Sequence, residues 1–198
     1  RRSAAAGVRR GDVLTSIDGI NFVTENSPEG IAKLQDGLFP SVLRAHKFGF
    51  NGKAEIALTP ANYSVSTVQN VKILLTATGA VGYFVFDSHL AKSEAELSAA
   101  IAQLKAANIT DLVIDLRYNG GGLVYIASEL AYMIAGPRHT AGRTFERLTY
   151  NDKRSAENES IPFLATGSAG QALPYLGLTR VSLLVTHGTA SASESVIN

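Results

Sequence analysis

The length, composition and charge of the sequence exclude several classes of protein. Its 198 residues, 45% of them hydrophobic and 18% charged, suit one globular core or one core with a small appended module. Lys and Arg number 18 against 17 Asp and Glu, so nucleic acid is not an expected partner. Because cysteine is absent, disulfides, a thiolate nucleophile and a Cys-based zinc site are excluded. No apolar run approaches the ~20 residues that a membrane-spanning helix needs.

The first part of the chain has the pattern of short strands joined by turns. Residues 11–19, GDVLTSIDG, place an apolar run before an Asp-Gly turn, and residues 48–60, FGFNGKAEIALTP, contain an Asn-Gly hairpin signal. Between them, residues 27–38 suit a short helix with Ser27 as its N-cap and Pro28 at its first position. This pattern predicts a small β-rich module.

Three ranges divide the chain. We assign residues 1–62 to the β-rich module and residues 63–70, which are mostly polar with spaced valines, to an extended connector. In residues 71–198, apolar strands alternate with longer helical periods. This alternation is typical of an α/β layer in which right-handed crossovers join parallel strands.

The first helix of the second domain has an apolar stripe. It follows residues 71–88, where two apolar runs meet at a Thr-Gly turn. Ser93 and Glu96 have the spacing of a capping box at its start, and Asn108 is a suitable stop. Helical periodicity places four apolar side chains on one face: Leu97, Ala100, Ile101 and Leu104.

Two further strands each lead into a turn and a helix. Residues 110–116, TDLVIDL, precede a turn with three glycines and a predicted helix over 123–136. Residues 180–188, RVSLLVTHG, predict another buried strand, which enters a stretch of small residues that suits the start of a helix. Polar residues dominate 138–168, which we expect to be a functional loop or an insertion.

These two strand ends are the best candidates for a site, because ligands of α/β layers lie beyond the carboxyl ends of the strands. The turn RYNGGG (117–122) lets the backbone approach a ligand with its N–H groups turned outward. In HGTASASE (187–194), a serine between strand and helix would direct its hydroxyl to the same space. Each feature alone is more often structural, but together they indicate a nucleophile beside an oxyanion hole.

The residues also resemble a known family. ITDLVIDLRYNGGG (109–122) and GTASASE (188–194) resemble the paired signatures of the carboxyl-terminal processing, or tail-specific, serine proteases of the S41 peptidases. AAAGVRRGDVLTSIDG (4–19) resembles the second half of the PDZ domain that precedes their catalytic domain. The resemblance covers most of the chain. It implies an α/β catalytic domain of the crotonase-like (ClpP/crotonase) type after a truncated PDZ-like module.

The resemblance also implies roles for particular residues. The nucleophile of the family is the serine three residues before the glutamate of the motif, which here is Ser191 before Glu194. The N–H of Ala192 would supply one oxyanion hydrogen bond. The second would come from the glycine turn, with Gly121 and Gly122 both open as donors.

The general base implied by the resemblance is a lysine on a strand beyond the serine motif, with a pKa lowered by burial. No lysine before Asn198 matches that motif, and Lys153, the last one, lies in the polar segment. We therefore expect the sequence to be an internal part of a longer protease, inactive by itself. A histidine base, His89 or His187, is a less favoured alternative.

Several neighbouring polar residues are expected to be structural. Arg117 is expected to anchor the glycine turn, and Glu194 to support the start of the last helix. Capping, packing or backbone hydrogen bonding is expected of five others: Asp87, Asp115, Thr189, Ser193 and Ser195. The motifs His-Glu-x-x-His and Gly-x-Ser-x-Gly are absent, which argues against a metallopeptidase and a lipase-type hydrolase.

The function implied by the resemblance is that of a serine endopeptidase that cleaves unfolded polypeptides or C-terminal tails, without cofactor or metal. The PDZ-like module would bind C-terminal peptides by strand addition. The location implied is the bacterial periplasm or cell envelope. Two alternatives stay open: a crotonase-like acyl-CoA enzyme, which would bind CoA and ignore serine-directed phosphonates, and a non-catalytic PDZ-type protein, which would bind peptides without turnover.

Overall fold

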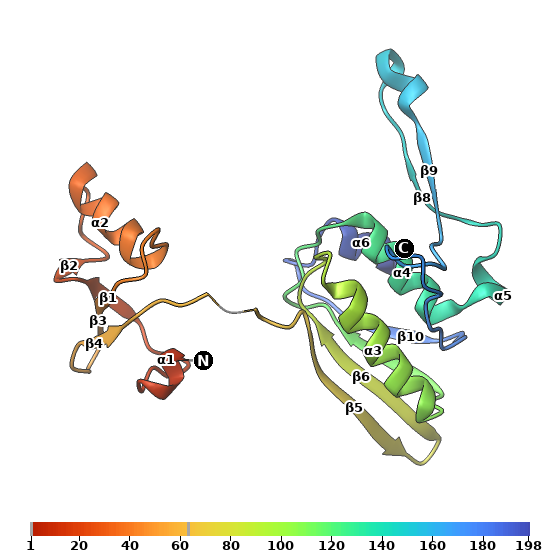
Figure 1. Cartoon of the computed structure of the whole chain (residues 1–198), viewed down its shortest axis with the longest axis horizontal. Coiled ribbons are helices and arrows are strands. Elements are labelled where there is room, and N and C mark those ends of the chain that lie inside the picture. Colours follow the sequence, from red (N-terminus) through yellow and green to blue (C-terminus); the bar gives the residue numbers. More distant parts are fainter. Residues whose placement is uncertain (1, 63) are drawn as a thin grey trace. The chain divides into compact units, whose positions relative to one another are not determined.

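The computed structural model describes residues 2–62 and 64–198. The chain divides into two compact units, Arg1–Ser64 and Val65–Asn198, each with its own sheet (Figure 1). Tyr63, the first residue of the predicted connector, lies outside the described residues. Within these described ranges, every helix is too short or too polar to cross a membrane.

The first unit contains the predicted β-rich sheet. Its strands lie in the order β2-β1-β3-β4, and neighbouring strands are antiparallel. The Asp18-Gly19 turn joins β1 to β2 with both residues at positive φ, as a tight hairpin requires. Ser27 caps the helix α2 as predicted, because its Oγ accepts the Gly30 N–H at 3.1 Å. The elements are α1 (Arg2–Ala5), β1 (Leu14–Ile17), β2 (Ile20–Asn21), α2 (Pro28–Leu38), β3 (His46–Phe50) and β4 (Ile56–Leu58).

The second unit is a mixed α/β domain. Its sheet has the order β10-β7-β6-β5: β6, β7 and β10 are parallel, whereas β5 forms an antiparallel hairpin with β6. In Figure 1, α3 lies against this hairpin, and it packs on both β5 and α4. The elements are β5 (Val68–Thr76), β6 (Gly79–Phe86), α3 (Ser93–Ala106), β7 (Asp111–Asp115), α4 (Val124–Ala135), α5 (Pro137–Thr140), β8 (Thr144–Leu148), η1 (Asp152–Glu157), β9 (Glu159–Pro162), β10 (Val181–Leu184) and α6 (Ala192–Ile197).

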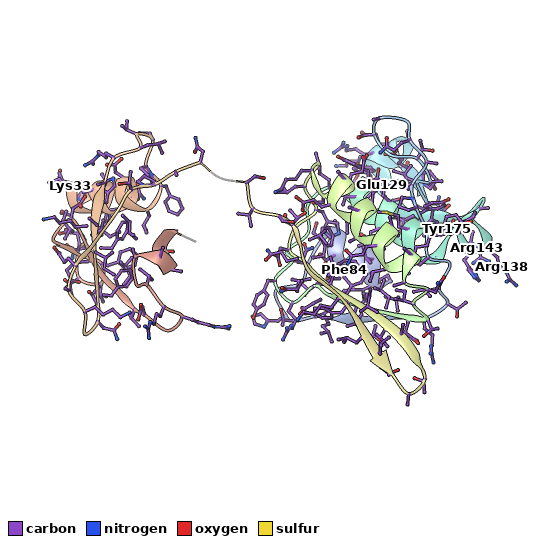
Figure 2. All side chains as sticks on the ribbon, turned by 60° about the horizontal axis from the view of Figure 1, so that its bottom comes forward. Lys33, Phe84, Glu129, Arg138, Arg143 and Tyr175 are labelled. Carbon is purple, nitrogen blue, oxygen red and sulfur yellow. The ribbon has the colours of Figure 1, made fainter. Side chains whose placement is uncertain are left out.

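The core of the second unit lies between the sheet and the helices α3 and α4. The predicted stripe on α3 is confirmed, since its four apolar side chains are buried. They meet apolar side chains from β6, β7 and α4, among them Phe84, which Figure 2 marks in the interior. A fully buried Leu, Ile or Phe contributes about 1.5–3 kcal/mol to folding. This core fixes β6 and β7, whose carboxyl ends lead into the candidate site.

Two predictions at the start of this unit are wrong in part. The connector predicted over residues 63–70 ends earlier, because β5 already begins at Val68. The capping box is absent: Ser93 Oγ donates to the carbonyl of Ser88, and α3 has no side-chain cap. The Glu96 carboxylate instead accepts the N–H groups of Thr67, at 2.6 Å, and Val68, at 3.1 Å. A long-range contact with the start of β5 replaces the local cap.

One prediction near the end of the chain needs correction, and the structure adds detail to another. The strand β10 is not buried: Val181 is 39% exposed and Leu184 is 40% exposed. The reason is its place at the edge of the described sheet, where it pairs on one side with β7. Residues 138–168, predicted to be a functional loop or an insertion, contain β8 and β9, which form an antiparallel hairpin that projects from the rest of this unit (Figure 1). Ser128 anchors its base through Pro162 and Leu164.

Glu129 is a buried carboxyl group in the middle of α4 (Figure 2). Its side chain is 1% exposed, and its Oε2 atom has no hydrogen-bond partner among the described residues. Burial, with a further contribution from the charge of Glu94 on α3, raises the pKa of Glu129 from 4.5 to about 7. The folded state therefore keeps a proton that the unfolded chain releases at lower pH.

We expect this proton to make the stability of the domain depend on pH. The free energy of unfolding should fall by about 3 kcal/mol as the pH rises from about 4.5 to about 7, because only the folded state still holds the Glu129 proton in that window. Glu129→Gln cannot titrate and should flatten this part of the profile, as measured by urea unfolding across that range. The exposed Glu159→Gln serves as the control. Equal slopes in wild type and Glu129→Gln would contradict the expectation.

Candidate active site

The two predicted strand ends lie side by side. In the parallel pair β7–β10, Leu184 is in register with Asp115, so the chain leaves both strands at the same edge. The segments that follow are the glycine turn, residues 116–122, and the serine loop, residues 185–191. The topology thus brings together two motifs that are about 70 residues apart in the sequence, as is general for parallel strands.

Hydrogen bonds hold the serine loop on the glycine turn. The hydroxyl of Thr186 donates to the carbonyl of Arg117 at 2.6 Å, and that of Thr189 donates to the carbonyl of Leu116 at 2.8 Å. The hydroxyl of Ser193 donates to the carbonyl of Asn119 at 3.2 Å. Thr189 and Ser193, for which capping or packing was predicted, thus bind the backbone of the glycine turn.

Ser191 has a strained backbone at the start of α6. It is exposed and has φ 56° and ψ −128°. The other non-glycine residues of the described chain with positive φ are Asp or Asn, which tolerate this region better. Such a conformation costs about 1–3 kcal/mol and is concentrated at functional sites. The Glu194 carboxylate accepts the Ser191 N–H at 2.7 Å and so supports the helix start, as predicted.

Gly121 packs directly against Ser191. A Cβ atom built on Gly121 would lie 2.7 Å from the Ser191 Cβ atom and 2.7 Å from the Ala190 carbonyl oxygen. The φ of Gly121 is 101°, which also disfavours any side chain. Glycine at this position therefore lets the turn approach the serine.

The N–H groups beside Ser191 differ in what they bind. That of Ala192 precedes the first intrahelical hydrogen bond of α6 and has no acceptor among the described residues. That of Gly121 donates to Asn119 Oδ1 at 3.0 Å. The exposed Gly122 makes no such hydrogen bond within the described chain. Ala192 and Gly122 are thus the predicted donors whose N–H groups are not already used.

Arg117 and Asp115 bind each other at the base of the glycine turn. The Arg117 guanidinium binds both carboxylate oxygens of the buried Asp115, at 2.9 Å from Nε and 2.7 Å from Nη2. These hydrogen bonds are the main reason that the pKa of Asp115 is lowered. The hydroxyl of Tyr83 also donates to Asp115 at 3.0 Å. The Arg117 side chain thus binds the end of β7, and its anchoring of the glycine turn stays a prediction.

Asn119, which was not among the predicted site residues, binds the end of β6, the glycine turn and the segment around Ser191. Its side chain is fully buried, and it contacts the end of β6, His89 and Gly121. Its carbonyl accepts hydrogen bonds from the Ser193 hydroxyl, at 3.2 Å, and from the Ala190 N–H, at 3.4 Å. The sequence held one signal for this role, because Asn119 is a polar residue at a strand end directly before the three glycines.

Neither histidine is placed as a base for Ser191. His89 is fully buried, and its Nδ1 atom lies 3.2 Å from Asn119 Oδ1. Burial lowers the pKa of His89, although its hydrogen bond to Asn119 opposes that effect. His187 is exposed, and no hydrogen bond joins it to Ser191 in the described chain. The alternative of a histidine base therefore has no support from these contacts.

Known proteins are similar to this sequence over most of its length. Residues 80–198 match the sequence profile of peptidase family S41. The carboxyl-terminal-processing protease of Synechocystis sp. is 28% identical over 190 residues, which cover 96% of this chain and 41% of that protein. The chloroplastic carboxyl-terminal-processing peptidase 1 of Arabidopsis thaliana is 28% identical over 203 residues, with coverages of 96% and 37%. The chain thus spans about two fifths of the length of these relatives.

A solved structure supports the fold. A protein of Bacteroides fragilis assigned to the S41 proteases has a TM-score of 0.64 and 21% identity, over 99% of this chain and 52% of that chain. At this identity the similarity concerns the fold alone. The profile match over residues 80–198 is a match of sequence and extends over more than half of the chain. The chain therefore belongs to peptidase family S41.

Proposed function

We propose that this chain supplies the nucleophile and the oxyanion hole of a serine endopeptidase. The observation that carries the proposal is Ser191, which is exposed, strained and packed against Gly121. Its Oγ atom would attack the carbonyl carbon of a peptide bond while its proton passes to a general base. The N–H groups of Ala192 and Gly122 would bind the oxygen that becomes negative. Return of the proton to the leaving amine releases one product, and water then hydrolyses the acyl ester.

We propose that the general base is a lysine outside residues 1–198. All lysines of the chain precede Ser191, and no hydrogen bond joins one of them to it in the described part. The coverage of about two fifths of the curated relatives leaves room for such a residue in the complete protein. A buried lysine with a lowered pKa would complete a Ser-Lys dyad.

The proposal extends to the substrate and to the two units. We propose that the second unit has the crotonase-like arrangement and that the first is a PDZ-like module, since it combines a four-stranded sheet with the helix α2. It would bind the C-terminal end of an unfolded polypeptide by strand addition. The curated relatives include bacterial and chloroplast processing proteases, and for this chain we propose the bacterial cell envelope.

A peptidase assay on the full-length protein tests this function. Its substrates are an unfolded polypeptide, the same polypeptide with its C-terminus amidated, and an acyl-CoA thioester. We expect cleavage of the free-tailed polypeptide, slower cleavage of the amidated form and no reaction with the thioester. Thioester turnover without proteolysis would favour the acyl-CoA alternative. Binding of C-terminal peptides without any turnover would favour the non-catalytic alternative.

A further inference from the structure

The side chain of Asn119 forms hydrogen bonds with three residues: Phe86, Gly121 and His89. Its Nδ2 atom donates to the carbonyl of Phe86 at 3.0 Å, at the end of β6. This contact identifies Oδ1 as the acceptor, and Oδ1 accepts the Gly121 N–H at 3.0 Å. The residue is 0% exposed, so water cannot replace these partners at low cost. The glycine turn is thereby tied to the core strand β6.

The orientation of Asn119 also determines the protonation of His89. Because Oδ1 can only accept, the Nδ1 atom of His89, at 3.2 Å, must carry the proton that joins them. The Nε2 atom is buried without a partner among the described residues, and burial lowers the pKa of His89, so a second proton on Nε2 is disfavoured. The ring packs edge-on against Phe86, with centroids 4.6 Å apart. His89 is thus a neutral imidazole that donates to Asn119.

The main chain of His89 holds the other side of the glycine turn. Its N–H donates to the carbonyl of Gly121 at 3.1 Å, and its carbonyl accepts the N–H of Leu123 at 2.9 Å. A Cβ atom on Gly122 would lie 2.5 Å from the His89 carbonyl oxygen. The turn that would bind the oxyanion is therefore enclosed between His89 and the serine loop.

The main chain of Asn119 reaches the serine loop on both sides of the nucleophile. Its carbonyl accepts the N–H of Ala190 at 3.4 Å and the hydroxyl of Ser193 at 3.2 Å. Ala190, directly before Ser191, and Ser193, two residues after it, thus bind the same oxygen atom. A displacement of Asn119 would move the serine and the glycine donors relative to each other.

We propose that Asn119 is a positioning residue that holds the oxyanion turn in register with Ser191, and that His89 is its buried, neutral hydrogen-bond donor. The proposal rests on the proposed peptidase function. Asn119 would contact no reacting atom, and its effect would come through Gly121 and the loop around Ser191. A displacement of about 1 Å in such a site lowers the rate by about 10²-fold.

Steady-state kinetics of the full-length protein test this role. We expect Asn119→Ala to lower kcat by about 10²-fold with little change in KM, since substrate would bind but meet misplaced groups. Thr140→Val is the matched control: Thr140 is buried and loses one hydrogen bond, to the carbonyl of Gly136 at 2.9 Å, away from the strand ends. It should lose stability and keep its kcat. Wild-type kcat in a folded Asn119→Ala variant would overturn the proposal.

A second variant covers the case in which Asn119→Ala does not fold. Asn119→Asp keeps the shape and the acceptor atoms, but its carboxylate would stabilise a protonated His89. We expect the pH profile of kcat to gain an ionisation that wild type lacks, because no charged side chain in the described chain contacts the His89 ring. Superimposable pH profiles would overturn the proposal.

Two measurements separate a failure of this inference from a failure of the peptidase function, because neither needs turnover. Nitrogen NMR of histidine-labelled protein should show His89 protonated at Nδ1. Hydrogen exchange of the segment with Gly121 should speed up in a folded Asn119→Ala variant, which lacks the Oδ1 acceptor of the Gly121 N–H. If both hold while wild type and Ser191→Ala are equally inactive, the function fails and the contact network stands. If the enzyme is active, either of two results would overturn the proposed contacts of Asn119: a His89 that is protonated at Nε2, or hydrogen exchange of the Gly121 segment that is the same in the variant and in wild type.

Discussion

Ser191→Ala is expected to reduce turnover of an unfolded polypeptide by about 10⁴- to 10⁶-fold in the full-length protein. The substitution removes the single atom that would attack the carbonyl carbon, and no other hydroxyl in the loop can replace it. The hydroxyls of Thr189 and Ser193 already donate to the carbonyls of Leu116 and Asn119. Folding should be preserved, because the backbone N–H of residue 191 keeps its hydrogen bond to the Glu194 carboxylate and loss of the side-chain half of the cap costs only about 1 kcal/mol.

Ser195→Ala is the matched control for that experiment. Ser195 lies four residues further along in α6 and its N–H donates to the Ser191 carbonyl at 3.3 Å, a bond that alanine keeps. The melting temperatures of both variants should stay close to that of wild type, and Ser195→Ala should keep its turnover. Activity in Ser191→Ala at the level of Ser195→Ala would mean that this serine is not the nucleophile.

Gly121→Ala is expected to lower kcat by at least about 10²-fold. The new methyl group would lie 2.7 Å from the Ser191 Cβ atom and 2.7 Å from the Ala190 carbonyl oxygen, and backbone cannot yield as a flexible side chain can. The serine loop must therefore shift away from the glycine turn, which would separate the proposed nucleophile, Ser191, from the proposed oxyanion donors. The positive φ of 101° adds a backbone cost of about 1–3 kcal/mol to the free energy of folding.

Gly142→Ala separates the steric effect from the backbone strain. Gly142 has φ 70°, and a Cβ atom there would meet nothing within 4 Å. Its alanine variant should lose stability through strain alone and keep its kcat, whereas Gly121→Ala should lose both. The comparison uses the melting temperature and the kcat of each full-length variant. Equal kcat values for the two variants would contradict the proposed role of the packing of Gly121 on Ser191.

The parts of the fold that sequence patterns predicted are those that depend on neighbouring residues. The apolar stripe on α3, the Ser27 cap of α2 and the turn at Asp18-Gly19 follow from local periodicity and turn chemistry. The meeting of the two strand ends was also predictable, because parallel strands place their carboxyl ends at one edge. These rules led to the glycine turn and the loop before α6, and the resemblance to the S41 signatures then implied Ser191.

The remaining features depend on partners that are distant in the sequence. Glu96 has the spacing of a capping residue, but the start of β5 offers it N–H groups that a local cap would leave unpaired. The apolar run of β10 predicts burial, yet exposure depends on its position in the sheet. The contacts of Asn119 come from β6, His89 and the serine loop, so no local pattern reveals them.

Covalent labelling tests directly whether Ser191 is the nucleophile. The full-length protein is treated with a fluorophosphonate, which reacts with activated serine hydroxyls, and the labelled peptide is identified by mass spectrometry. We expect one phosphonylated residue, Ser191, and a loss of peptidase activity in proportion to its labelling. Two outcomes would contradict the assignment of Ser191 as the nucleophile. In one, the protein cleaves polypeptides while Ser191 stays unlabelled. In the other, a different serine is labelled as the activity disappears.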